Sequence, residues 1–122
     1  METPVNKTQS SLNFLLVEHD LGAPTNGAAQ GPQAVLEHLF AKIPQAKTSA
    51  VSTISQITAS SKEQTPHAKS LEQTLETCKT LRDAVSKSLK KKHFTVVLSG
   101  DHSTAIGTIA GIKTAFPSLE IG

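Results

Sequence analysis

The stretch from Val96 to Gly107 limits what this chain can fold into more than any other. Apolar residues 96–98 are followed at once by a polar cluster, Gly100-Asp101-His102-Ser103. This order predicts a buried strand that enters a sharp turn and then a helix, with no long loop between them. In a parallel sheet such a turn lies at the carboxyl end of a strand, where open α/β folds bind their ligands. The chemistry of this chain is therefore expected at this turn.

The rest of the chain repeats the same alternation of short apolar runs and helical stripes. Strands are predicted at residues 12–17, 51–57 and 94–98. Helices are predicted at residues 32–43, 66–92 and 104–116, with Pro32 at a first helical position and Pro44 and Pro117 as helix ends. Residues 58–66 read as a polar linker, and residues 119–122 resemble the start of a fourth strand.

Strands that alternate with helices predict a parallel sheet with right-handed crossovers. Such a sheet needs helices on both faces, so the expected fold is a three-layer α/β/α arrangement. With 122 residues, the chain is expected to be one domain, residues 1–122, which ends at the start of the fourth strand. The sheet is expected to be incomplete, with an exposed strand edge that invites association.

Composition excludes several classes of protein. The net charge of +2 is too small for a typical nucleic-acid binder. No apolar run approaches the length of a membrane-spanning helix, and the first residues lack the pattern of a secretory signal. We therefore expect a cytoplasmic protein with neither a nucleic-acid nor a membrane partner.

Two further features each allow two interpretations. The single cysteine, Cys78, excludes an internal disulfide, and its place on the helical stripe predicts a core residue; the alternative is a reactive thiol. The basic run at residues 90–92 predicts the C-terminus of a helix, where cations complement the dipole. The alternative for that run is a contact with a polyanion.

The residues of the turn fit a structural role and a metal site. Asp101 or Ser103 can cap the following helix. Alternatively, His102 is a metal ligand, and Asp101 either binds the metal itself or orients the histidine. The positive N-terminus of a helix opposes a cation, so a metal there needs further carboxylates from other strands. Residues 18–20, Glu-His-Asp, are the nearest candidates, but each is expected to be solvated or to cap the backbone.

Two other possibilities use the hydroxyl groups of the turn. An anion could bind Ser103 and Thr104 at the helix N-terminus, although no glycine-rich phosphate motif is present. Ser99 or Ser103 could form a nucleophilic pair with His102, although the GxSxG motif is absent and neighbours on one turn rarely face each other.

Residues 97–108 resemble the GGDHS motif of the arginase (ureohydrolase) family, with Ser99 in place of the first glycine. Residues 22–34 resemble that family's N-terminal loop, which enters a helix through Gly-Pro. The resemblance implies the N-terminal part of an arginase-like fold, in which His102 binds one of two manganese ions. It also implies a complete enzyme, usually a homo-oligomer, that hydrolyses a guanidino compound to urea and an amine.

The resemblance leaves the substrate and the activity of the chain open. Arginine is favoured over agmatine and formiminoglutamate. The family's other metal ligands, in DAHxD and DxDxxDP motifs, are absent from this sequence, so the chain alone is expected to be inactive and to contain no catalytic residue. The alternative is a stand-alone, non-catalytic binding or interaction module derived from the same fold.

Overall fold

The computed structural model describes residues 11–24, 26–56 and 70–121. The strands are β1 (Leu12–Glu18), β2 (Ala50–Ser55) and β3 (Phe94–Ser99). The α-helices are α2 (Gly31–Lys42), α3 (Leu71–Lys90) and α4 (Ala105–Ala115). Short 3-10 helices are η1 (Ala28–Gln30), η2 (Pro44–Thr48) and η3 (His102–Thr104). The three predicted strands and three predicted helices are confirmed to within a few residues where the structure describes them. Residue 57 of the predicted second strand, the predicted linker at residues 58–66 and residues 66–69 of the predicted long helix lie outside the described residues.

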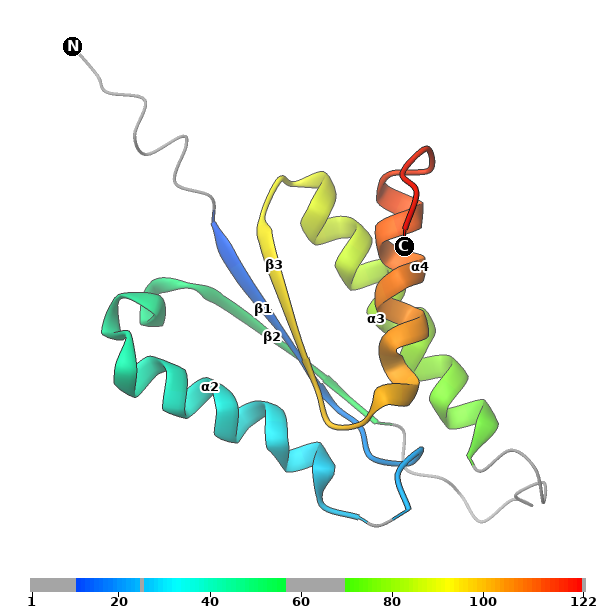
Figure 1. The fold of residues 1–122 in the computed structure, drawn as a ribbon, viewed down its shortest axis with the longest axis horizontal. Coiled ribbons are helices and arrows are strands. Elements are labelled where there is room, and N and C mark those ends of the chain that lie inside the picture. The colour runs from blue at the N-terminus through cyan, green and yellow to red at the C-terminus, as the bar shows by residue number, and fades with distance from the viewer. Residues whose placement is uncertain (1–10, 25, 57–69, 122) are drawn as a thin grey trace.

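The three strands form a parallel sheet in the order β2-β1-β3 (Figure 1). Strand β1 is central, and its residue Phe14 is paired with Val51 on one side and with Val96 on the other. A central strand is covered on both faces, which is why residues 14–17 are all apolar and all buried. Strand β2 lies at one edge of the described sheet.

Helices cover both faces of this sheet and produce the expected three layers (Figure 1). Phe14 and Leu16 point to one face and pack against Leu36 of α2. Leu15 and Val17 point to the other face and pack against α3. The two cores follow from the alternation of side chains along a strand, which sends successive residues of β1 to opposite layers.

Helix α4 packs on α3 through two glycines. A Cβ on Gly107 would lie 2.7 Å from the carbonyl oxygen of Cys78, and a Cβ on Gly111 would lie 2.6 Å from Cβ of Val85. The helices therefore approach more closely than any larger residue would permit. Cys78 is buried at this contact, which confirms its prediction as a core residue, and burial raises the pKa of its thiol.

The basic run ends α3, as predicted. Lys87 and Lys90 lie in its last turn, and the N–H of Lys92 donates to the carbonyl oxygen of Leu89 at 2.9 Å. In the described part of the chain, no helix combines the length and apolar character needed to cross a membrane.

The predicted start of a fourth strand is not observed at residues 119–121. Instead, the carbonyl oxygen of Leu119 accepts a hydrogen bond from Nζ of Lys113 at 2.7 Å, and its N–H donates to Phe116 at 3.0 Å. A strand requires a neighbouring strand to satisfy its backbone groups. These residues lie next to α4 rather than beside a described strand, so they bond to the helix end instead (Figure 1).

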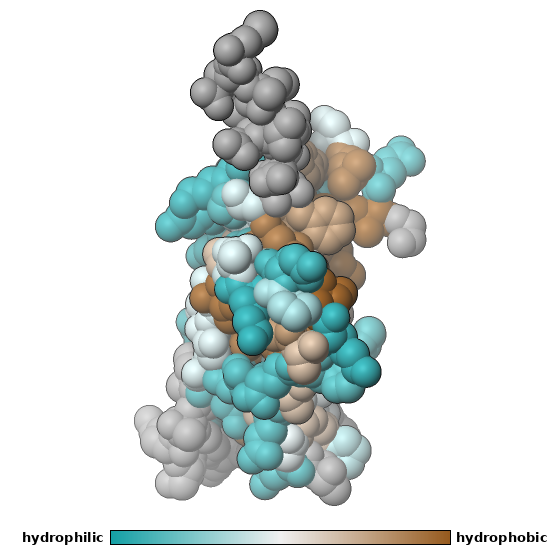
Figure 2. Space-filling model, turned by 90° about the vertical axis from the view of Figure 1, so that its left-hand side faces the viewer, coloured by the Kyte–Doolittle hydropathy of each residue, from teal (hydrophilic) through white to brown (hydrophobic). Residues whose placement is uncertain are grey.

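Apolar side chains remain exposed on several elements. Among the large apolar residues that the structure describes, Ile106 of α4 is the most exposed, at 72%, and Phe94 on β3 is 63% exposed. Figure 2 shows another side of the molecule, the one on the left in Figure 1, where hydrophobic residues emerge between hydrophilic ones. Val35, Ile43 and Val51 are among the exposed apolar residues of α2, the turn after it and β2.

Candidate functional site

The turn after β3 is organised by the side chain of Asp101. Asp101 is the N-cap of η3, and its Oδ1 accepts a hydrogen bond from the N–H of Ser103 at 2.8 Å. The hydroxyl of Ser103 donates to the same oxygen. The prediction that Asp101 caps the helical segment is therefore confirmed, and the cap uses one carboxylate oxygen only.

The backbone of the turn is held between two other loops. The N–H of Gly100 donates to the carbonyl oxygen of Val17 at 3.1 Å. A Cβ at Gly100 would lie 2.3 Å from the carbonyl oxygen of His19 and 2.6 Å from that of Ala28. Only glycine permits this approach, so the turn, the end of β1 and η1 form one closely packed unit.

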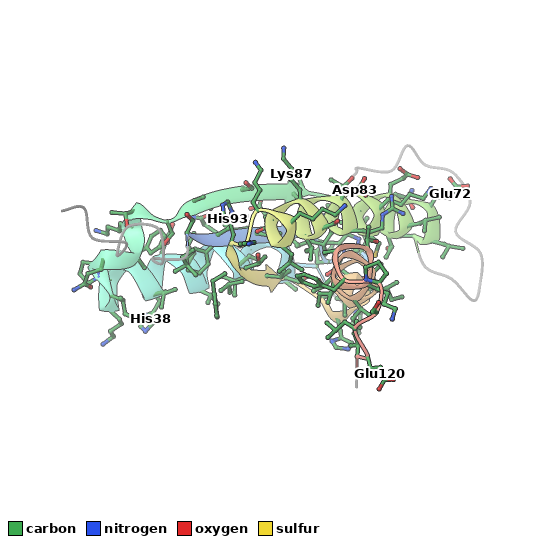
Figure 3. All side chains as sticks on the ribbon, turned by 90° about the horizontal axis from the view of Figure 1, so that it is seen from above. His38, Glu72, Asp83, Lys87, His93 and Glu120 are labelled. Carbon is green, nitrogen blue, oxygen red and sulfur yellow. The ribbon has the colours of Figure 1, made fainter. Side chains whose placement is uncertain are left out.

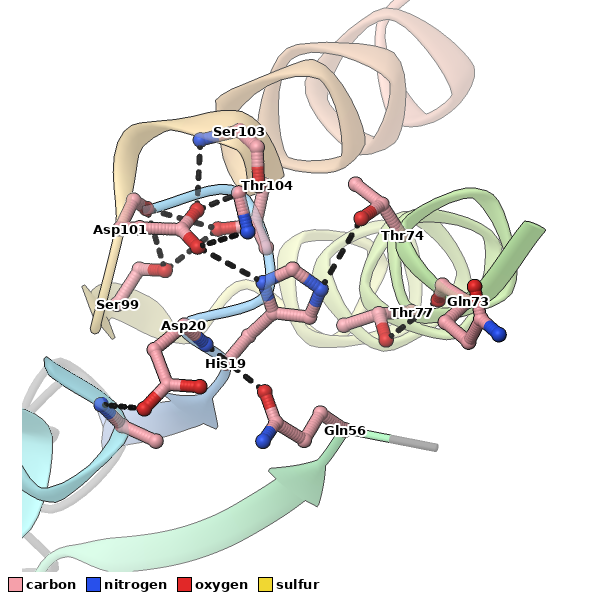
Figure 4. A network of polar contacts seen from close by, with 12 residues as sticks. His19, Asp20, Gln56, Gln73, Thr74, Thr77, Ser99, Asp101, Ser103 and Thr104 are labelled. Carbon is pink, nitrogen blue, oxygen red and sulfur yellow. Dashed lines mark hydrogen bonds and ion pairs between the residues drawn. The ribbon is translucent and has the colours of Figure 1, made fainter. Parts of the chain in front are cut away.

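The second oxygen of Asp101 bonds to the segment that follows β1 (Figure 4). Oδ2 lies 3.1 Å from Nδ1 of His19 and accepts the N–H of Gly22 at 2.9 Å. Because an ionised carboxylate only accepts, Nδ1 carries the proton in this pair. The other ring nitrogen, Nε2, lies 3.4 Å from Oγ1 of Thr74 on α3. His19 thus joins the ends of β1 and β3 to the first turns of α3.

His19 is fully buried, with 0% of its surface exposed, which corrects the expectation that it is solvated or caps the backbone. The reason is the strand order. Since β1 and β3 are neighbours in a parallel sheet, the residues after their carboxyl ends lie side by side beneath α3. A polar ring can be buried there because both of its nitrogens have partners.

Opposing effects act on the pKa of Asp101. Burial by itself would raise it, but hydrogen bonds from the side chain and backbone of Ser103, from Gly22 and from His19 outweigh burial and hold the pKa below the ordinary value. Asp101 is therefore a carboxylate at neutral pH, and its charge is compensated by donors from two loops.

Asp20 caps the loop before α2. Its Oδ2 accepts the N–H of Gly27 at 2.8 Å and that of Ala29 at 3.3 Å. The backbone N–H of Asp20 donates to Oε1 of Gln56 at 2.8 Å. The predicted capping role is confirmed for this residue, and the bond from Gly27 lowers its pKa most. Glu18, the third residue of the polar cluster, is partly exposed and pairs through its backbone with β2.

Replacing Asp20 with asparagine is expected to reveal this capping charge in the pH dependence of stability. Because folding lowers the pKa of Asp20 from its ordinary value of 3.8, its charge stabilises the fold above that pH. The contribution is lost as the pH falls through the lower folded value. Urea unfolding at neutral pH should therefore show the variant to be less stable than the unmodified chain. The difference should shrink well below pH 3.8, and a difference independent of pH would show that the charge of Asp20 is not involved.

His102 is not hydrogen-bonded to the carboxylate of Asp101. Its side chain is exposed and lines an open pocket of about 460 Å³ beside β3 and α4. Asp101 also lines this pocket, but its carboxylate bonds to His19, Gly22 and Ser103, not to His102. Asp101 can therefore hold His102 in place only through the backbone of the turn, and not through a hydrogen bond to the imidazole.

The turn offers a metal ion one ligand, His102. The exposed imidazole of His102 can coordinate a cation. Among residues 11–24, 26–56 and 70–121, however, no three or more His, Cys, Asp or Glu side chains come close enough to hold a metal ion. The residues described here supply at most a single corner of a metal centre.

The hydroxyl groups of the turn form neither the serine–histidine pair nor the anion site that the sequence allowed. The hydroxyl of Ser103 donates to Asp101, and that of Ser99 bonds to Thr104 and to the carbonyl oxygen of Asp101. Neither hydroxyl is hydrogen-bonded to His102 within the described part of the chain, so no serine–histidine pair is formed. Thr104 is buried, with 1% of its surface exposed, and is not accessible to an anion.

The pairing of His19 with Asp101 was not predicted from the sequence. The signal for it was present, because both residues directly follow predicted strands and the strands are expected to be parallel. What was missing was the order of the strands. A histidine after β1 can meet an aspartate after β3 only when these two strands are adjacent.

Together these features define an α/β protein with a parallel sheet, helices on both faces and a polar site at the carboxyl ends of the strands. The sequence model of the arginase family matches residues 11–121. The chain belongs to the arginase family.

Relatives of known structure and sequence agree with this assignment. An arginase of Brevibacillus brevis is 32% identical over an alignment of 119 residues, and the match covers 91% of this chain and 38% of the relative. The arginase of Bacillus caldovelox matches with a TM-score of 0.68 and 25% identity over 85% of this chain and 36% of that one. The Entamoeba histolytica arginase, solved in complex with L-ornithine, matches in fold with a TM-score of 0.77 at 23% identity, over 91% and 39% of the two chains. The chain thus spans less than two fifths of the length of these relatives.

Proposed function

We propose that this chain is the N-terminal portion of a manganese-dependent hydrolase that cleaves a guanidino compound to urea and an amine. The observation that supports this most directly is the exposed His102 at the carboxyl end of β3. It lies in the segment similar to the GGDHS motif, within a chain of the arginase family. We further propose arginine as the substrate, a cytoplasmic location and a homo-oligomer for the complete enzyme.

In this proposal His102 supplies one ligand to a manganese centre. When bound, two manganese ions would lower the pKa of a water molecule and stabilise the charge that develops during hydrolysis. Asp101 does not take part directly. Its carboxylate holds the turn on which His102 stands through bonds to His19, Gly22 and Ser103.

The same observations support the proposal that the 122-residue chain is inactive by itself. A single imidazole cannot retain a pair of divalent cations, because metal affinity grows with the number of correctly placed ligands. The described residues offer no cluster that would add to His102.

A manganese titration of the 122-residue chain tests this proposal. Mn²⁺ broadens the proton resonances of any imidazole that it approaches, so each histidine reports separately in a nuclear magnetic resonance spectrum. We expect the resonances of His102 to broaden at a lower Mn²⁺ concentration than those of His38. His38 is a suitable internal reference because it is also exposed and projects outward from α2 (Figure 3).

Two variants and an activity assay complete the test. His102→Ala assigns the resonance and should remove the preferential broadening, whereas His38→Ala should leave it unchanged. Equal broadening of the His102 and His38 resonances would contradict the proposal that His102 is a metal ligand. In the presence of Mn²⁺ and arginine we expect no urea release by the chain alone, and turnover would overturn the proposed inactivity.

A further inference from the structure

The function proposed above uses the fully buried His19 only as one of several partners of the Asp101 carboxylate, although this histidine stands at the centre of the site. Its two ring nitrogens contact residues from two different segments, Asp101 after β3 and Thr74 on α3. A buried polar side chain that connects separate segments restricts their relative positions, because losing either contact leaves a polar atom without a partner.

The consequence for the turn follows from the hydrogen bonds of Asp101. Oδ1 accepts a hydrogen bond from Ser103, the residue that follows His102 in the chain. Oδ2 binds His19 and Gly22, which lie in the segment after β1. The carboxylate therefore connects the backbone that carries His102 to the central strand of the sheet. Of the two donors to Oδ2, the N–H of Gly22 makes a solvent-exposed hydrogen bond, whereas the ring of His19 is fully buried.

We infer that His19 is a positioning residue for His102. Through Asp101 it holds the turn after β3 against the end of β1, and so sets where the exposed imidazole of His102 stands. This inference deepens the proposed function and rests on it for the role of His102 as a ligand. It makes a prediction about one nitrogen of His19 in particular, because only Nδ1 faces Asp101.

Two variants, His19→Asn and His19→Gln, test the two ring nitrogens of His19 one at a time. Asparagine can place an N–H near the position of Nδ1 and retain the bond to Asp101. Glutamine reaches toward the position of Nε2, near Thr74, and leaves Asp101 without this donor. Both variants bury a neutral amide of similar polarity, so they differ mainly in which contact they keep. Val85→Ala serves as a third variant, since it weakens the packing of α3 and leaves all contacts of His19 in place.

The first measurement is hydrogen exchange of the Ser103 amide, which is bonded to Asp101. We expect faster exchange in His19→Gln than in His19→Asn when both are compared at equal distance from their unfolding midpoints. In Val85→Ala, exchange at Ser103 should follow global stability only. Equal exchange in the two amide variants would overturn the inference, because a general loss of stability would then account for both.

The second measurement is the Mn²⁺ concentration that broadens His102. Loss of a group that orients a metal ligand typically weakens binding by about tenfold or more. We expect an increase of about this size in His19→Gln and a near-normal concentration in His19→Asn. An unchanged concentration in His19→Gln would overturn the positioning role while leaving His102 as a ligand. If the unmodified chain shows no preference for His102, the proposed function fails, and the exchange measurement alone decides whether His19 positions the turn.

Discussion

Replacing Gly100 with alanine is expected to lower the free energy of unfolding by more than about 3 kcal/mol, among the larger effects seen for single substitutions. The new Cβ would lie 2.3 Å from the carbonyl oxygen of His19 and 2.6 Å from that of Ala28. Both neighbours are backbone atoms, which cannot rotate away as a side chain can. The turn would have to separate from the end of β1, and urea unfolding followed by circular dichroism measures the loss.

Gly31→Ala is the matched control for this substitution. Gly31 begins α2 with φ −60°, and a Cβ there would meet nothing within 4 Å. We expect this variant to match the unmodified chain or to exceed its stability by up to about 1 kcal/mol, because alanine restricts the unfolded chain. If Gly100→Ala were equally harmless, the close contact between the turn and the segment after β1 would be wrong.

Replacing Leu81 with alanine is expected to cost about 2 to 5 kcal/mol of stability, the range for removing a large buried aliphatic side chain. Leu81 is 0% exposed and belongs to the core formed by β1, β2 and α3. Its removal leaves a cavity between the helix and the central strand. The loss is comparable with much of the stability of a small domain, so the unfolding midpoint in urea should fall sharply.

Leu71→Ala on the same helix provides the control. Leu71 is 59% exposed, and a surface substitution of this kind should change stability by no more than about 0.5 kcal/mol. Similar losses at the two positions would show that α3 does not bury the face that contains Leu81.

The secondary structure could be predicted because each element carries its own local signal. Residues 14–17 are continuously apolar, as a strand covered on both faces requires, and Leu81 and Val85 share one stripe of a helix. Pro32 and Pro44 limit α2 from within the sequence. The prediction of a fourth strand beginning at residues 119–122 is wrong for the described residues 119–121, because a strand depends on a neighbouring strand that a local pattern cannot supply.

The site could be predicted only in part. The turn itself and the capping role of Asp101 follow from neighbours in the sequence, since Asp101 bonds to Ser103 two residues away. His19 lies 82 residues from Asp101, and its burial depends on which strands are adjacent. No pattern within either segment specifies that adjacency.

The sequence by itself therefore determined the alternation of strands and helices, the strand–turn–helix at residues 96–107 and the family resemblance that His102 carries. Only the tertiary structure decided that β1 lies between β2 and β3, that the carboxylate of Asp101 bonds to His19, and that the side chain of His102 remains exposed. The physical reason is the distance along the sequence between the residues that interact. Helix stripes, caps and turns are set by residues a few positions apart, whereas strand order is set by the burial of side chains from the whole chain.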